Sequence, residues 1–170
     1  MRFIQINLNN CETAQDLLRQ TVAEKKIDVV IVSEPYKVPE GSVWVSNKTK
    51  KASIWVCGAY PFQEIAVRGE RGYVVAKVNG ISIFSCYAAP SLSLQEFEEV
   101  IDGIARNARK YKPSIIAGDF NAWAEEWGSR LTNARGQMFA RLDLVLANVG
   151  NTNTFRRHVG GSVIDRANIG

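Results

Sequence analysis

The spacing of hydrophobic and polar residues divides the first third of the chain into a strand, a helix and a second strand. Apolar side chains alternate with polar ones over residues 2–8, which predicts a strand. The helix that follows is expected to turn Leu17, Leu18 and Val22 toward the sheet. The continuous apolar run 28–33 is typical of a central strand covered on both faces.

Several short strand-like runs then follow one another and predict an antiparallel meander within the α/β frame. These runs are 42–45, 53–57, 64–68, 73–78 and 81–87. The dipeptide Asn79-Gly80 lies between the last two and is a strong type I′ hairpin signal. The middle of the chain therefore predicts β-structure joined by tight turns.

The second half of the chain returns to helices and strands. Ser93 and Glu96 form a capping box that begins a helix, which Pro113 ends before an apolar strand. A last helix is predicted from about Asn133, through Phe139, Leu142 and Leu146, to Gly150. Residues 161–165 begin another strand, but the pattern fails over 166–170. We therefore predict one domain over residues 1–165 and a non-matching tail over 166–170.

Composition narrows the class of protein. With 170 residues, of which 46% are hydrophobic, the chain can bury the core of one domain. No apolar run is long enough to span a membrane and no signal peptide opens the chain, so we expect an intracellular protein with no membrane partner. Cys11, Cys57 and Cys86 are odd in number and far apart, which favours buried thiols over disulfides or a zinc site.

The balance of charge is mildly basic. Twenty-one Lys and Arg against seventeen Asp and Glu give a net charge of +4. This suits a polyanionic partner. The basic residues gather at 48–51, at Arg68 with Arg71, and at Arg156 with Arg157. Each group is either an ordinary solvated loop or a phosphate contact.

Polar side chains recur where the predicted strands end. Gly118-Asp119-Phe120-Asn121 follows a buried strand, and Asn7, Glu34 and Tyr87 occupy similar positions. By itself the Asp119 motif is also compatible with a strand-to-loop turn in which Asp119 caps the next residues. If the strand ends converge, their oxygen ligands, without Cys or His nearby, favour Mg²⁺ or Mn²⁺ over zinc.

These segments resemble the successive motifs of a known superfamily. The segments are Gln5-Ile6-Asn7-Leu8-Asn9, Ser33-Glu34-Pro35-Tyr36, Cys86-Tyr87-Ala88-Ala89-Pro90-Ser91, Gly118-Asp119-Phe120-Asn121-Ala122, Trp127-Gly128-Ser129 and Gly161-Ser162-Val163-Ile164-Asp165. In this order they resemble the endonuclease/exonuclease/phosphatase superfamily. More narrowly, they resemble the apurinic-type endonuclease domain of non-LTR retrotransposon polyproteins, particularly arthropod elements that target ribosomal RNA genes.

The resemblance implies a fold, a reaction and partners. The fold would be a two-sheet α/β (α+β) sandwich. The reaction would be metal-dependent nicking of one strand of double-stranded DNA, leaving a 3′ hydroxyl that primes reverse transcription. The partners would be DNA and the reverse transcriptase domain of the same polyprotein, with a nuclear location.

The resemblance also assigns roles to individual residues. Glu34 would ligate the metal and Asn7 would position its carboxylate. Asp119 would orient and activate the attacking water. Asn121 would hold either that water or a phosphate oxygen. Tyr87 would hydrogen-bond the phosphate. The matched residues for catalysis and metal binding are Asn7, Asn9, Glu34, Tyr87, Asp119, Asn121 and Asp165, and the candidate DNA contacts are Arg68, Arg71, Arg156 and Arg157.

Two departures from the family pattern affect these expectations. Asn9 stands where cellular relatives have an aspartate that assists metal binding. The family's Ser-Asp-His motif is absent, so Asp165 has no matching histidine to orient, and His158 is expected to be an exposed loop residue. The resemblance therefore predicts that the chain lacks the last strands of the fold, which would weaken its stability and activity.

Two alternatives to a DNA endonuclease stay open at this point. An enzyme of the same fold could act on a phospholipid or an inositol phosphate. A non-catalytic remnant could bind nucleic acid through its basic loops and lack the chemistry. The tryptophans are expected to pack in the core or in loops and not to form a base-stacking platform; they are Trp44, Trp55, Trp123 and Trp127.

Overall fold

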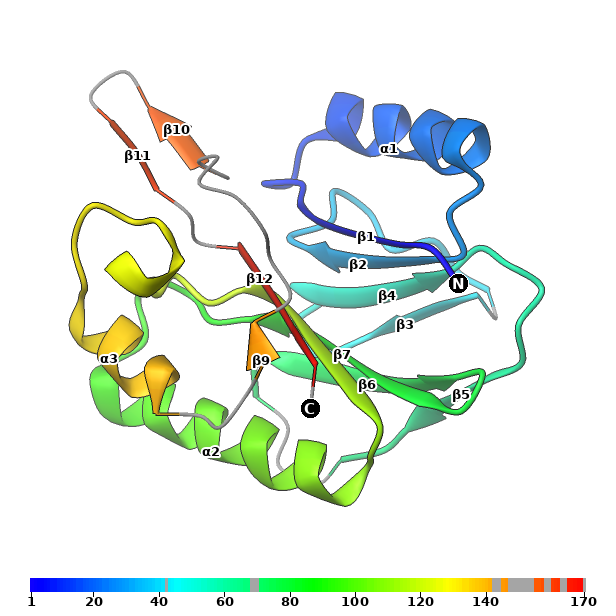
Figure 1. Cartoon of the computed structure of the whole chain (residues 1–170). Helices are drawn as coiled ribbons and strands as arrows, with labels where there is room; N and C mark the ends of the chain where they lie inside the picture. The colour runs from blue at the N-terminus through cyan, green and yellow to red at the C-terminus, as the bar shows by residue number, and fades with distance from the viewer. Residues whose placement is uncertain are drawn as a thin grey trace.

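The computed structural model is a sandwich of two β-sheets with helices on its outer faces (Figure 1). It describes residues 1–41, 43–67 and 71–141 with their side chains, and the backbone of residues 145–146, 155–157, 160–162 and 165–169. The helices are α1 (Glu12–Lys25), α2 (Leu94–Lys110), α3 (Ala134–Ala140) and the 3₁₀ turn η1 (Glu125–Trp127). None of the described helices is long and apolar enough to cross a membrane.

The strands divide between the two sheets and one separate pair. The first sheet has the order β1 (Phe3–Asn7), β2 (Val29–Ser33), β4 (Ala52–Val56) and β3 (Trp44–Ser46). The second has the order β5 (Phe62–Ile65), β6 (Tyr73–Val78), β7 (Ile81–Tyr87), β8 (Ser114–Asp119), β12 (Asp165–Ile169) and β9 (Val145–Leu146). Strands β10 (Phe155–Arg157) and β11 (Gly160–Ser162) pair with each other. The predicted two-sheet α/β sandwich is confirmed.

The middle of the chain does not form one meander, which corrects that prediction. Strands β3 and β4 belong to the first sheet, whereas β5, β6 and β7 form the antiparallel run of the second. The hairpin at Asn79-Gly80 is confirmed, because both residues have positive φ and join β6 to β7. Short strands separated by turns carry no signal that distinguishes one sheet from two.

The core lies in three layers that follow from the alternation of side chains along each strand. On β2, Val29 and Ile31 belong to the cluster between the two sheets, while Val30 and Val32 pack in the cluster with α1. Every residue of β2 is buried, so the predicted central strand covered on both faces is confirmed. A third cluster fills the space between the second sheet and α2 with α3.

Two predictions about helices need correction. Leu18 and Val22 of α1 are buried, but Leu17 is 62% exposed, because it lies about a third of a turn away from the face that those two residues share. The last helix, α3, ends at Ala140 and does not continue to Gly150. Val145 and Leu146 form β9 instead, so the apolar spacing came from a helix followed by a strand. The other residues beyond Arg141 in that range lie outside the described residues.

Residues 166–169 continue β12, which corrects the expectation that they complete no strand. They pair antiparallel with β8, with Ile169 opposite Ile115. The sequence Arg-Ala-Asn-Ile alternates polar and apolar residues, and this period of two fits a strand. The domain boundary at residue 165 stays a prediction. Of the three thiols expected to be buried, Cys86 is buried, Cys57 is half-buried and Cys11 is exposed.

Candidate active site

Two pairs of parallel strands end at the same edge of the sandwich. In the first sheet Asn7 on β1 is opposite Ser33 on β2, and Glu34 follows directly. In the second sheet Tyr87 on β7 is opposite Asp119 on β8. Parallel strands deliver their carboxyl ends to one edge. The convergence predicted from the sequence is therefore present, although the four strands belong to two different sheets.

The side-chain amide of Asn7 joins the two carboxylates across the sheets. Its Nδ2 donates to Asp119 Oδ2 at 2.7 Å and to Glu34 Oε2 at 3.3 Å. Its Oδ1 accepts a hydrogen bond from the backbone N–H of Asn9 at 2.8 Å, which fixes which way the amide faces. The Glu34 and Asp119 carboxylates therefore lie within reach of the same nitrogen atom, the arrangement that a shared cation requires.

Asp119 is held in place by groups from both sheets. It is 2% exposed, its backbone N–H donates to Ser33 Oγ at 3.2 Å, and its Oδ1 accepts from the N–H of Asn121 at 2.9 Å. The Ser33 hydroxyl in turn donates to the carbonyl oxygen of Cys86 at 3.1 Å. Ser33 thus connects the end of β2 to β7 and β8. Sequence reasoning missed it, and the only signal was a hydroxyl closing an otherwise apolar run.

Gly118 allows β7 and β8 to approach closely just before Asp119. Its φ is +146°, and a Cβ added there would lie 1.9 Å from the Cys86 carbonyl oxygen. No L side chain fits this position without moving the backbone. The glycine of the Gly-Asp-x-Asn motif is therefore required by the geometry that places Asp119.

Glu34 occupies a strained backbone position beside a lysine. Its φ is +48°, in the left-handed region that residues other than Gly, Asn and Asp rarely adopt. Its Oε1 lies 3.4 Å from Nζ of Lys51, which also donates to Asn10 Oδ1 at 2.9 Å. The Glu34 side chain is only 15% exposed. Sequence reasoning placed Lys51 only in a basic cluster, because nothing local indicates that its loop reaches Glu34.

Tyr87 donates a hydrogen bond to the Glu34 carboxylate and stays protonated. Burial is the largest cause that raises the pKa of the Tyr87 phenol, followed by that hydrogen bond and by the negative charges of Glu34 and Asp119. A neutral phenol remains a hydrogen-bond donor over the whole physiological pH range. Tyr87 can therefore present its proton to an anionic oxygen at this edge.

Asn121 and Asn9 lie at the margin of the cluster. Asn121 has φ +47° and its Nδ2 donates to the Ala88 carbonyl oxygen at 3.1 Å, which ties the loop after β8 to the loop after β7. Asn9, with φ +47°, reaches the cluster through its backbone N–H. The side chain of Asn121 also lines a cavity of about 310 Å³ beside this loop, whereas Asn9 contacts Asn7.

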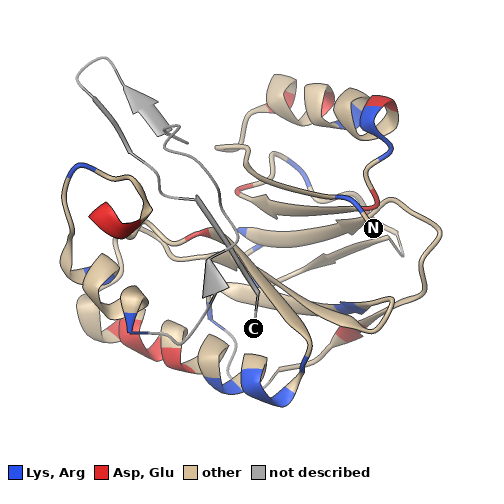
Figure 2. Cartoon of the chain, in the orientation of Figure 1, with Lys and Arg blue, Asp and Glu red and all other residues tan. Residues whose placement is uncertain are grey.

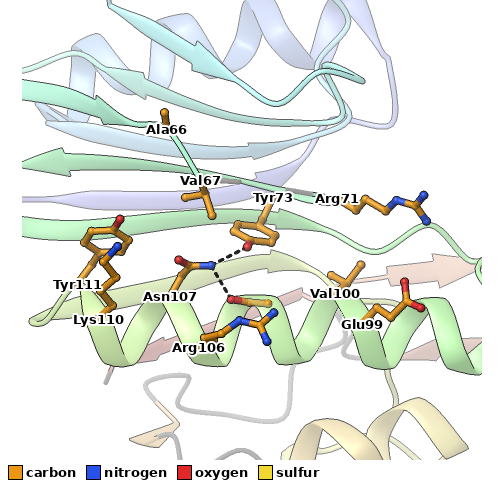
Figure 3. A pocket seen from close by; sticks show the side chains of 11 residues that line it. Ala66, Val67, Arg71, Tyr73, Glu99, Val100, Arg106, Asn107, Lys110 and Tyr111 are labelled. Atoms are coloured by element: carbon orange, nitrogen blue, oxygen red, sulfur yellow. Dashed lines mark hydrogen bonds between the residues drawn. The ribbon is translucent and has the colours of Figure 1, made fainter. Parts of the chain in front are cut away.

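Of the remaining predicted site residues, those that the structure describes lie on different segments of the chain. Arg71 lines a separate cavity of about 600 Å³ on the side of the molecule, together with Arg106 and Lys110 of α2 (Figure 3). The register places Asp165 opposite Asp119 along the backbone. Arg156 and Arg157 lie on β10. Arg68 and His158 are outside the described residues, as are the side chains of Arg156, Arg157 and Asp165.

The donor set suits a hard divalent cation. Mg²⁺ in proteins is held by one or two carboxylates and keeps several waters or phosphate oxygens, which matches Glu34 and Asp119. A group of three or more His, Cys, Asp or Glu side chains that could hold a metal ion does not occur among the described residues, so these residues do not form a complete metal cage by themselves.

Lys and Arg come from several elements and do not gather on one face of the described chain (Figure 2).

The comparisons with known proteins agree with this architecture. A family described as "Endonuclease/Exonuclease/phosphatase family" matches residues 4–167. The endonuclease domain of TRAS1, a telomere-specific non-LTR retrotransposon, has a TM-score of 0.84 at 24% identity and covers 99% of this chain and 84% of that chain. No curated protein sequence matches.

Two further solved structures share the fold. A 3′-5′ exonuclease (NExo) from Neisseria meningitidis has a TM-score of 0.69 at 16% identity, with 99% of this chain and 86% of that chain covered. An AP endonuclease from Archaeoglobus fulgidus has a TM-score of 0.74 at 13% identity, with the same coverage of 99% and 86%. At these identities the likeness concerns the fold alone.

Proposed function

The chain belongs to the endonuclease/exonuclease/phosphatase family, and from this we propose that it is a metal-dependent phosphodiesterase that nicks one strand of double-stranded DNA. The observation that carries the proposal is the single Asn7 amide that holds the Glu34 and Asp119 carboxylates together beside a protonated Tyr87. This arrangement offers a cation site, a proton acceptor and a donor to phosphate at one edge of the sandwich.

We further propose that the chain is the endonuclease domain of a non-LTR retrotransposon, with the nick serving to prime reverse transcription. The likeness to the TRAS1 endonuclease domain and the order of the sequence motifs support this class. The partners would be target DNA in the nucleus and the reverse transcriptase of the same polyprotein. The sequence motifs resemble those of elements that target ribosomal RNA genes, whereas TRAS1 is telomere-specific.

Glu34 and Asp119 would hold the cation. Mg²⁺ held there would neutralise charge on the phosphate and stabilise the departing oxygen. Asp119, buried and fixed by Ser33, accepts the proton of the attacking water. Tyr87 donates to a non-bridging phosphate oxygen, and the Asn121 amide orients the water or a phosphate oxygen.

The reaction forms one bond to phosphorus and breaks another. The water oxygen bonds to phosphorus, and the bond between phosphorus and the 3′ oxygen breaks. The products are a 5′ phosphate and a 3′ oxygen, which takes up a proton from solvent to become a hydroxyl. That hydroxyl is a competent primer, which links the chemistry of the site to reverse transcription.

The test is to incubate the purified chain with an end-labelled DNA duplex and Mg²⁺, and then to ask whether a polymerase extends the nicked strand directly. We expect extendable nicks that disappear in Glu34→Gln and Asp119→Asn. The matched controls are Glu98→Gln and Asp102→Asn, two exposed carboxylates of α2, which keep the activity.

Three results would overturn the proposal. Nicks that survive chelation of the metal would exclude the cation role. Salt-sensitive DNA binding without any product would select a non-catalytic binding protein. Hydrolysis of an inositol phosphate or a phospholipid without DNA cleavage would keep the reaction type and replace the substrate.

A further inference from the structure

Trp123 lies beside the candidate active site and, unlike the other three tryptophans, has an exposed side chain. Trp44 and Trp55 stack on each other with ring centroids 5.2 Å apart, and Trp127 is buried against Phe139, so these three confirm the expected packing role. Trp123, two residues after Asn121, is 43% exposed. Packing in the core therefore does not explain why a tryptophan stands at this position.

The backbone that carries Trp123 is fixed although its side chain is exposed. The N–H of Trp123 donates to Asn133 Oδ1 at 3.0 Å, and its carbonyl oxygen accepts from the N–H of Asn133 at 2.9 Å. The first turn of α3 packs so closely that a Cβ added to Gly136 would lie 1.8 Å from that carbonyl oxygen. An exposed aromatic ring on a clamped backbone loses little conformational entropy when it binds a partner.

Trp123 forms one wall of a cavity of about 310 Å³ that reaches Asn121. Pro90 and Leu94 also line the cavity and are apolar, and Asn121 and Asn133 are its polar amide side chains. The cavity thus combines a flat aromatic surface, apolar sides and side-chain amides, and it adjoins the residues that gather around Asp119.

The loop that carries Pro90 is also held by hydrogen bonds. The guanidinium of Arg135, which is 7% exposed, donates to the carbonyl oxygens of Ala89 at 3.1 Å, Pro90 at 3.1 Å and Leu92 at 2.6 Å. Its positive charge is therefore taken up by the loop after β7. Arg135 is the cationic side chain that lines this cavity, so the cavity offers an anionic phosphate little. It suits an uncharged planar heterocycle.

We propose that this cavity receives a nucleobase of the DNA strand next to the phosphate that is cut, with the base stacked on the indole of Trp123. The inference rests on the proposed function for its substrate class. Base stacking on an aromatic side chain tolerates any base, and Asn121 and Asn133 add polar side chains to the lining of the cavity. We expect a base that is unpaired from its partner to enter this cavity of about 310 Å³, and a base held in an intact duplex to stay outside it.

The experiment uses the full chain and DNA duplexes that carry one unpaired 2-aminopurine, in chelator so that no cutting occurs. Stacking on Trp123 quenches the fluorescence of this base, and anisotropy reports affinity. We expect quenching by the unaltered chain and by Trp123→Phe. Trp123→Ala should lose the quenching and bind this DNA roughly tenfold more weakly, with less effect on a fully paired duplex. The control is Leu131→Ala, which alters a 69% exposed residue that does not line the cavity.

The outcomes separate this inference from the proposed function. Quenching and affinity that survive in Trp123→Ala would overturn the inference even if the chain nicks DNA. Trp123-dependent quenching in a chain that never nicks DNA would support the base site while the nicking proposal fails. A chain that binds neither DNA would overturn both. Thermal unfolding of Trp123→Ala near that of the unaltered chain excludes misfolding as the cause.

Discussion

Replacing Asn7 with alanine tests whether one amide holds the two carboxylates in place. The variant removes the 2.7 Å hydrogen bond to Asp119 and the 3.3 Å hydrogen bond to Glu34. The shorter one is a charge-assisted bond to a carboxylate that is 2% exposed, and such a bond contributes about 2 kcal/mol. The longer bond is weaker, so we assign nearly all of the loss to Asp119.

This loss has a measurable size. For a chain of this length, about 2 kcal/mol corresponds to a fall in Tm of about 4–8 °C. If the same free energy is lost from the transition state, nicking slows roughly thirtyfold. Calorimetry without metal and then with Mg²⁺ measures the first quantity. Mg²⁺ should raise the Tm of Asn7→Ala more than that of the unaltered chain, because the cation replaces the donor that the two carboxylates lost.

The matched control is Asn107→Ala on α2. Asn107 also donates from Nδ2 to two acceptors, Tyr73 Oη at 3.0 Å and the Gly103 carbonyl oxygen at 2.9 Å, and neither is charged (Figure 3). This control should lower the Tm without a Mg²⁺-dependent recovery and without loss of nicking. The reasoning is refuted if Asn7→Ala unfolds within about 1 °C of the unaltered chain, or if Mg²⁺ raises the Tm of both variants equally.

Three further predictions follow from single contacts. Ser33→Ala removes the hydrogen bond to the Cys86 carbonyl oxygen and the one from the Asp119 N–H, so it should destabilise the fold by about 1–3 kcal/mol in denaturant titrations; no change in midpoint would contradict this. Lys51→Met removes a half-exposed cation from Glu34 and should tighten Mn²⁺ binding by up to about fivefold in calorimetric titrations; weaker binding would show that Lys51 assists the metal. Hydrogen bonds from Ser93 lower the pKa of Glu96, so the ionised carboxylate stabilises the fold. Glu96→Gln should therefore be less stable than the unaltered chain near neutral pH, and this difference should disappear as the pH falls through the folded-state pKa of Glu96; an equal difference at acid pH would refute this.

The sequence predicted the convergence of the strand ends better than it predicted the bounds of the elements around them. A buried apolar run identifies β2 and β8, and the carboxyl ends of parallel strands converge, so Glu34 and Asp119 could be expected at one edge. The capping box of α2 was also predicted correctly, because the Ser93 and Glu96 side chains bond each other's backbone N–H groups within four residues. Local patterns with a local cause were predicted correctly.

Features that depend on tertiary contacts could not be predicted from the sequence. The sequence does not show that the site is shared between two sheets joined through Ser33, nor that the loop carrying Lys51 reaches Glu34. Spacing alone also extended α3 beyond Ala140, because Phe139 and Leu146 fit a helical period while β9 is fixed by its pairing with β12. Exposure of Trp123 likewise depends on how α3 packs.

Conversion of supercoiled plasmid to open circles by the purified chain tests the central claim most directly. We expect open circles to form with Mg²⁺ and not with chelator. They should be lost in Asp119→Asn, while this variant keeps the unfolding transition of the parent. A folded, soluble chain that leaves the plasmid supercoiled in Mg²⁺ and in Mn²⁺ would contradict it.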